Sequence, residues 1–235
     1  MTTTTVASPT IDYLAIAEEL EPGEVRVFRN VAWEDYEWLH EQWPLDSQPV
    51  RVSYHEGTME IMSTSALHET YAHFVDGMIR LLSLRLRIDI RFFGSATIKK
   101  SRRRKGLEPD ACFYVQTVPQ LGNRLKLDFA VDPPPDVALE VDIYHGSIPK
   151  LPIYAGLGIP EIWRYDGRTV TMFLLQQDHY VEAAASRALP MLTPEVLTRF
   201  LKQMQEENEF QAMIAFEDWI STARGTDPAH HPSHQ

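Results

Sequence analysis

Two carboxylates and one ammonium in this chain could act together in catalysis: Asp110, Glu140 and Lys150. Carboxylate oxygens are the hard ligands that Mg²⁺ and Mn²⁺ prefer. Such an ion lowers the pKa of water and offsets the charge that builds on phosphate oxygens during attack. A lysine ammonium can orient the attacking water or neutralise the same oxygens. The three residues are therefore a minimal set for phosphate ester hydrolysis, and the alternative is a turn residue with two surface side chains.

The segments around the two acids favour the first interpretation. Residues 137–143 follow three prolines and are short, β-branched and mostly apolar, which predicts a buried strand that begins after the prolines. Glu140 lies in the middle of this strand, and a buried carboxylate is costly without a metal or a cationic partner. Residues 108–115 predict another strand, with Asp110 at its mouth.

Lys150 begins a segment that is typical of a short helix ending at Gly158. Residues 159–167 then predict a strand that closes in an Asp-Gly turn. A strand, a helix and a strand in this order indicate a right-handed crossover between two parallel strands.

Apolar spacing predicts further elements around this unit. A long helix over residues 65–86 carries Glu69 near its start, where the acid could face the site or lie exposed on the helix surface. The other predictions are an aromatic-rich helix within residues 10–45, a hairpin over 50–62 that turns at 55–57, strands over 169–174 and 180–182, and two amphipathic helices that start at Thr193.

Several short motifs occur in an order that resembles a known family. They are Met59-Glu60-Ile61-Met62-Ser63, His68-Glu69, Glu108-Pro109-Asp110, and the segments 135–141, 150–155 and 159–166. No motif is specific alone, but their order and spacing over roughly residues 30–180 resemble the Uma-type restriction endonuclease family of the PD-(D/E)XK nuclease superfamily. The resemblance implies an α/β fold with a restriction-endonuclease-like mixed central sheet flanked by helices, to which this chain adds N- and C-terminal helices.

The resemblance also implies a metal site. Asp110 and Glu140 match the two metal-binding acids of the superfamily, so they would hold Mg²⁺ or Mn²⁺ together with the Val141 carbonyl. Glu69 matches the acid of the preceding helix. A second proline-aspartate pair ends at Asp136, but that residue lies more than about 10 Å from Glu140 along the strand at ~3.3 Å per residue. We therefore assign Asp136 to the start of the strand.

The catalytic lysine departs from the superfamily pattern. The superfamily places it two residues after the second acid, where this chain has Asp142. The resemblance moves it to the following helix, as Lys150. The alternatives are Lys99, Lys100 or a site without activity.

A run of basic residues precedes Asp110: Lys99, Lys100, Arg102, Arg103, Arg104 and Lys105. These side chains could bind phosphates beside the cleaved bond, which would make the affinity for DNA depend on salt concentration. The alternative is a hairpin loop whose charges are exposed for solubility. No aromatic residues interleave with the run, so base stacking is not indicated.

Composition is that of an ordinary globular protein. The chain has 235 residues, of which 44% are hydrophobic and 23% charged, and its single cysteine, Cys112, fits a small buried apolar residue. It has no apolar run of about 18 residues and no apolar leader, so we expect a cytoplasmic protein without a membrane partner. The net charge is −11, but residues 51–194 hold 17 bases and 16 acids, so local patches there could still bind DNA.

The chain is expected to act as a metal-dependent endonuclease on DNA, and a homodimer would suit a nuclease that cuts two strands. The alternative is a nuclease fold that has lost activity and binds nucleic acid or a protein partner. The predicted segments are an N-terminal helical extension over 1–45, a nuclease-like core over 46–185, C-terminal helices over 186–226 and a disordered tail over 227–235.

Overall fold

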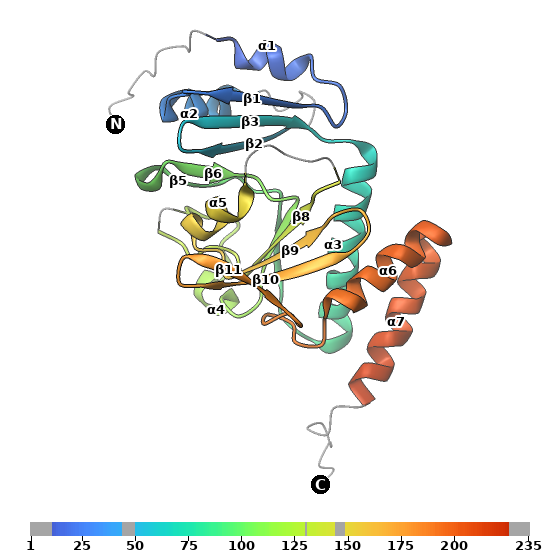
Figure 1. Cartoon of the computed structure of the whole chain (residues 1–235). Helices are drawn as coiled ribbons and strands as arrows, with labels where there is room; N and C mark the ends of the chain where they lie inside the picture. Colours follow the sequence, from blue (N-terminus) through green and yellow to red (C-terminus); the bar gives the residue numbers. More distant parts are fainter. Residues whose placement is uncertain (1–10, 44–49, 130, 144–148, 226–235) are drawn as a thin grey trace.

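Two β-sheets with helices around them make up the described part of the chain (Figure 1). The computed structural model describes residues 11–43, 50–129, 131–143 and 149–225. A six-stranded sheet lies at the centre, with the long helix α3 (Ala66–Leu86) on one face, and a five-stranded sheet lies beyond its upper edge in Figure 1. The predicted α/β class is confirmed, whereas the second sheet was not expected.

The central sheet is mixed because one of its strand pairs is parallel. Its order is β11-β10-β9-β8-β7-β4, and every described neighbouring pair is antiparallel except β8 and β9. The strands are β4 (Arg91–Gly94), β7 (Ala111–Tyr114), β8 (Val137–Val141), β9 (Glu161–Tyr165), β10 (Val170–Gln176) and β11 (His179–Ala183).

Helix α5 (Lys150–Leu157) connects the parallel pair, so the predicted strand, helix and strand are confirmed. All five residues of β8 are buried, as expected for a strand that is covered on both faces. Leu139 and Val141 join the apolar core under α3, while Ala138 joins the core under α5. Side chains alternate along a strand, so Glu140 points to the α5 side with Ala138.

Helices α3 and α6 (Pro194–Glu206) cover the other face of the central sheet, and α7 (Glu209–Gly225) packs on both of them. Helix α3 begins after Ser65, whose hydroxyl accepts a hydrogen bond from the His68 N–H at 3.2 Å. Helix α6 begins after a Thr193 cap, as the sequence predicted. The described helices include none with both the length and the apolar character of a bilayer-spanning segment.

The second sheet is antiparallel, with the order β1-β3-β2-β6-β5. The predicted hairpin forms its middle as β2 (Val50–His55) and β3 (Thr58–Ser63). The basic run forms another hairpin, in which β5 (Ile98–Lys100) and β6 (Lys105–Leu107) flank the 3-10 turn η1 (Ser101–Arg103). Strands of three residues carry too little apolar alternation to be recognised from sequence, so β5 and β6 were not predicted as strands.

The N-terminal segment is helical only in part. The helices α1 (Tyr13–Glu18) and α2 (Trp33–Gln42) pack on the second sheet, and α2 is the predicted aromatic-rich helix. Between them, β1 (Val25–Arg29) pairs with β3, which corrects the expectation of a helical extension. Another short helix, α4 (Val118–Leu121), follows β7. The division of the chain at residues 45, 185 and 226 stays a prediction, and the tail predicted to be disordered lies outside the described residues.

Candidate active site

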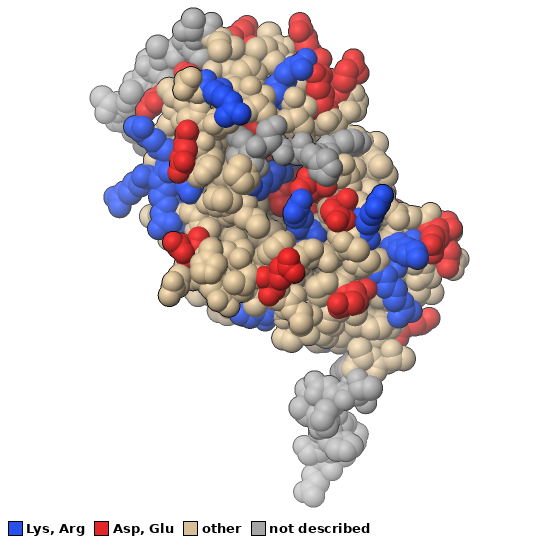
Figure 2. All heavy atoms as spheres, in the orientation of Figure 1, with Lys and Arg blue, Asp and Glu red and all other residues tan. Residues whose placement is uncertain are grey.

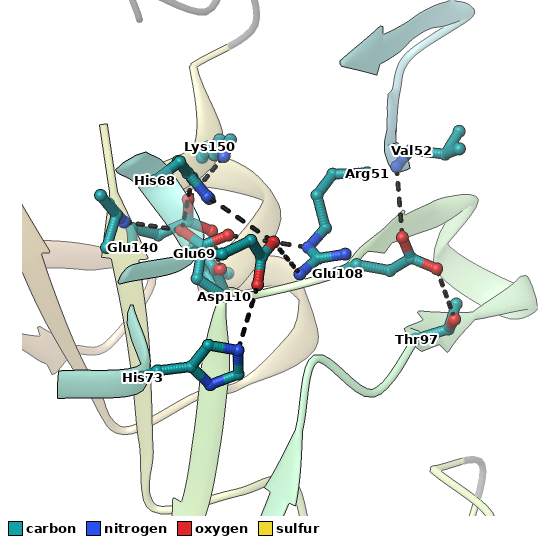
Figure 3. Close-up of polar contacts among 12 residues, drawn as sticks. Arg51, Val52, His68, Glu69, His73, Thr97, Glu108, Asp110, Glu140 and Lys150 are labelled. Atoms are coloured by element: carbon teal, nitrogen blue, oxygen red, sulfur yellow. Dashed lines mark hydrogen bonds and ion pairs between the residues drawn. The ribbon is translucent and has the colours of Figure 1, made fainter. Parts of the chain in front are cut away.

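The backbone of β8 fixes the carboxylate of Asp110 (Figure 3). Asp110 comes directly before β7, and its N–H donates to the Leu139 carbonyl at 3.0 Å. Its Oδ2 accepts a hydrogen bond from the Val141 N–H at 2.6 Å. The Asp110 side chain is 1% exposed. These two contacts involve the residues on either side of Glu140, so Asp110 is held next to the second acid.

Glu140 accepts hydrogen bonds from two side chains of α5. The Lys150 Nζ donates to Glu140 Oε2 at 2.5 Å, and the Tyr154 hydroxyl donates to Oε1. Lys150 is the first residue of α5 and Tyr154 lies one turn later on the same helix face. The crossover helix therefore supplies the cationic partner that a buried acid in β8 requires.

Electrostatics couple the three charged groups. Burial raises the pKa of the Glu140 carboxyl, the Lys150 ammonium acts against this rise, and the charge of Asp110 adds to it. Burial would lower the pKa of Lys150, but the carboxylates of Glu140 and Asp110 outweigh this effect and hold that pKa above its ordinary value. Lys150 is therefore an ammonium at neutral pH.

A second group of charges approaches Asp110 from α3 and β2 (Figure 3). His68 Nε2 lies 3.3 Å from Asp110 Oδ2. Arg51 lies between two acids, with Nε 3.7 Å from Asp110 Oδ1 and Nη2 3.1 Å from Glu69 Oε1. Glu69 thus faces the site through Arg51 and is not an isolated helix acid. Proximity to His68 lowers the pKa of Glu69 to about 2, with Arg51 adding to the effect against burial.

His68 carries a positive charge in this arrangement. Burial acts to lower its pKa, but the carboxylates of Asp110 and Glu69 outweigh burial and raise the pKa to about 9. Its imidazolium and the Arg51 guanidinium therefore offset the charges of the two acids on this side of the site.

One oxygen of Asp110 has the properties of a metal ligand. Oδ1 is buried, and no described residue donates a hydrogen bond to it. Among the described residues, no group of three or more His, Cys, Asp or Glu side chains could hold a metal ion. Two neighbouring carboxylates are a donor set that suits Mg²⁺, which keeps several of its waters when it binds to proteins.

Comparison with known families adds an independent finding. A family model described as "Uma2: Putative restriction endonuclease" matches residues 33–202, which is most of the chain. The chain belongs to the Uma2 family. This family is part of the PD-(D/E)XK-like nuclease superfamily, so the resemblance and the restriction-endonuclease-like fold expected from the sequence are both confirmed. A search of curated proteins found no match.

The position that holds lysine in the superfamily is occupied by an ion pair in this Uma2 chain. Asp142 accepts hydrogen bonds from Arg164 Nε at 3.0 Å and Nη2 at 2.6 Å. The acid of the second proline-aspartate pair, Asp136, is buried and accepts hydrogen bonds from the N–H groups of Val115 and Thr117. Asp136 thus ties the start of β8 to the end of β7, in line with its assignment to the strand start.

The basic run lies at the end of α5 that is far from Glu140. Figure 2 shows Lys and Arg side chains gathered at the left edge of the molecule, where Figure 1 places β5 and β6. Lys99 Nζ lies 3.8 Å from Glu37 Oε1. The side chains of Lys100, Arg103 and Lys105 donate hydrogen bonds to backbone carbonyls of α5. Arg102 and Arg104 are exposed. His145, which lies between Glu140 and Lys150 in the sequence and could approach a metal or phosphate, is outside the described residues.

Sequence reasoning missed three residues of this Uma2 site: Arg51, His68 and Tyr154. Tyr154 could have been found, because it follows Lys150 at helical i, i+4 spacing. His68 precedes Glu69 at a capped helix start, so its direction could not be read from spacing alone. Arg51 reaches the site through the pairing of β2, a long-range contact that leaves no local signal in the sequence.

Proposed function

We propose that this chain is a divalent-metal-dependent endonuclease that hydrolyses phosphodiester bonds in DNA. The observation that carries the proposal is the meeting of Asp110, directly before β7, with Glu140 of β8 and Lys150 of α5 in a member of the Uma2 family. Two acids next to one ammonium are the charges that phosphate hydrolysis requires.

Asp110 and Glu140 would hold Mg²⁺ or Mn²⁺ together with the Val141 carbonyl. When bound, the ion supplies Lewis acidity toward a phosphate oxygen and lowers the pKa of water. Asp110 Oδ1 is available for this role because it accepts no hydrogen bond from a described residue. The Val141 N–H and His68 keep Oδ2 in place.

Lys150 acts as a hydrogen-bond donor in this proposal. Because its pKa is raised, it keeps its proton at neutral pH and cannot serve as a general base. Its ammonium orients the attacking water or stabilises the negative charge that develops on the phosphate. Tyr154 holds the Glu140 carboxylate, and Glu69 holds Arg51 beside Asp110.

A second candidate function is a nuclease fold without activity that binds nucleic acid or a protein partner. The specific observation in its favour is Arg51, whose guanidinium lies 3.7 Å from the available oxygen of Asp110. A side-chain cation at that position can offset the charge that a metal ion would otherwise offset.

Calorimetric titration of Mn²⁺ distinguishes the two. We expect wild type to bind Mn²⁺ and to cleave plasmid DNA in the same samples, and the Asp110→Asn, Glu140→Gln double variant to do neither. The Asp136→Asn variant is the matched control, since it changes the other proline-aspartate acid and should still bind the ion. Absence of Mn²⁺ binding in wild type would favour the inactive module.

A further inference from the structure

Cations of the hairpin of β5, η1 and β6 bind backbone carbonyls of α5, two of them in its C-terminal half. The final carbonyls of a helix have no partner within the helix, and positive charge is favourable there. Three side chains of the basic run donate to carbonyls of α5: Lys100 Nζ to Leu157 at 2.6 Å, Arg103 Nη1 to Gly156 at 2.5 Å and Lys105 Nζ to Pro152 at 3.0 Å.

Lys105 also packs directly on the helix backbone. A Cβ atom added to Gly156 would lie 2.4 Å from Lys105 Cδ, which is closer than real Cβ contacts, so the Lys105 side chain would have to shift away from the helix. Gly156 is therefore needed for the stem of Lys105 to lie against α5. The hydrogen bond to the Pro152 carbonyl continues this contact toward the N-terminal half of the helix.

These hydrogen bonds bind the same helix that carries Lys150 and Tyr154, both of which donate to Glu140. A helix moves as a rigid element, so its distance from β8 depends on the contacts at both of its ends. At its C-terminal half, the basic hairpin supplies the side-chain donors to the Gly156 and Leu157 carbonyls, while Leu157 itself is buried in the apolar cluster under α5.

We propose that Lys100, Arg103 and Lys105 are positioning residues, which hold α5 so that Lys150 meets Glu140, and that they are not phosphate contacts. The side chains of Arg102 and Arg104 are exposed and make no hydrogen bond or ion pair with a described residue, so they are the part of the run that remains available for DNA. The expected loss of DNA cleavage rests on the proposed function. The effect of these residues on the position of Lys150 does not depend on it.

The test uses the full chain with Lys105→Met, which keeps the stem over Gly156 but removes the donor. A buried, paired ammonium exchanges its protons slowly, so the Lys150 ammonium should give an NMR signal in wild type. We expect that signal to be lost in Lys105→Met, the amides of α5 to exchange at least tenfold faster, and kcat for DNA cleavage to fall at least tenfold. The midpoint of urea unfolding should stay close to that of wild type, and Lys100→Met should reproduce the pattern.

The Arg102→Met, Arg104→Met double variant is the matched control. It should leave the Lys150 signal and the α5 amides unchanged, weaken binding to a DNA duplex and reduce the slope of log K against log salt by about 1.8, from ~0.9 for each lost phosphate contact. The proposal is overturned if Lys105→Met keeps the Lys150 signal, or if it reduces the salt slope as the control does. A wild type that fails to cleave DNA would remove the proposed function, and the Lys150 signal would still decide the positioning role.

Discussion

The Lys150 ammonium lies 2.5 Å from the Glu140 carboxylate and joins the first residue of α5 to the middle of β8. The two side chains are 21% and 4% exposed, so the pair is largely removed from water. The two charges attract each other strongly at this distance, but removing them from water costs free energy. The pair therefore affects stability chiefly when one partner is removed and the other stays buried.

Removing either partner should therefore cost more than removing both. In metal-free protein we expect Lys150→Met to lower the free energy of unfolding by about 3 kcal/mol, because the carboxylate stays buried without its cation. The Lys150→Met, Glu140→Gln double variant should lose less than the Lys150→Met variant alone. Urea unfolding at pH 7 in a chelating buffer measures the two single variants, Lys150→Met and Glu140→Gln, and the double variant, and strictly additive losses would contradict the coupling.

Variants at positions 142 and 150 test which of the two holds the residue that is essential for cleavage. Asp142 and Arg164 are 24% and 44% exposed, so Asp142→Asn should cost at most about 1 kcal/mol of stability. We expect this variant to keep its initial rate of plasmid cleavage within about twofold, whereas Lys150→Met should lose about 100-fold or more, as for removal of a transition-state donor. The reverse ranking of the two rates would return the essential role to position 142.

Asp136 should matter for folding and not for catalysis. Its Oδ2 accepts hydrogen bonds from Val115 N at 2.7 Å, Thr117 N at 3.0 Å and Thr117 Oγ1 at 3.0 Å. Asp136→Ala leaves buried donors without an acceptor and should cost about 3 kcal/mol. Thermal unfolding checks the loss, and cleavage well below the midpoint should stay near that of wild type. A loss of Mn²⁺ binding in this variant would mean that the two proline-aspartate acids were assigned to the wrong roles.

Glu69 predicts a pH dependence of stability. Its pKa is about 2 in the folded protein against 4.5 as the ordinary value, so the unfolded state binds more protons between these limits. The contribution of Glu69 is thus fully present above pH 4.5 and is lost as pH falls toward 2. It amounts to about 3 kcal/mol at most, from ~1.36 kcal/mol per pKa unit. Glu69→Gln should be less stable than wild type at pH 6, and this difference should vanish near pH 2 in urea unfolding experiments without metal.

The elements that the sequence predicted are those with strong local signals. The prolines before Val137, the β-branched run of β8 and the glycine at position 158 define a strand and a helix stop without help from the rest of the fold. The meeting of Asp110 and Glu140 came from the resemblance to a family, since residues this far apart in sequence meet only through the pairing of β7 and β8.

The parts that escaped prediction depend on contacts between distant segments. Strand β1 includes two arginines and becomes a strand by pairing with β3. Arg51 reaches Asp110 only because the fold brings β2 close to the residue before β7. The basic run was expected to meet phosphate or solvent, but half of it binds helix carbonyls, which no local pattern of charge reveals.

The close contact between Gly156 and the Lys105 stem has an evolutionary consequence. Any side chain at position 156 would overlap the Lys105 stem where it lies here, so the stem would have to leave the helix. Relatives that replace the glycine are therefore expected to carry a shorter residue at position 105 or to direct its side chain elsewhere, and the contact seen here requires the glycine. The two positions should covary across the family, although neither is expected to touch DNA.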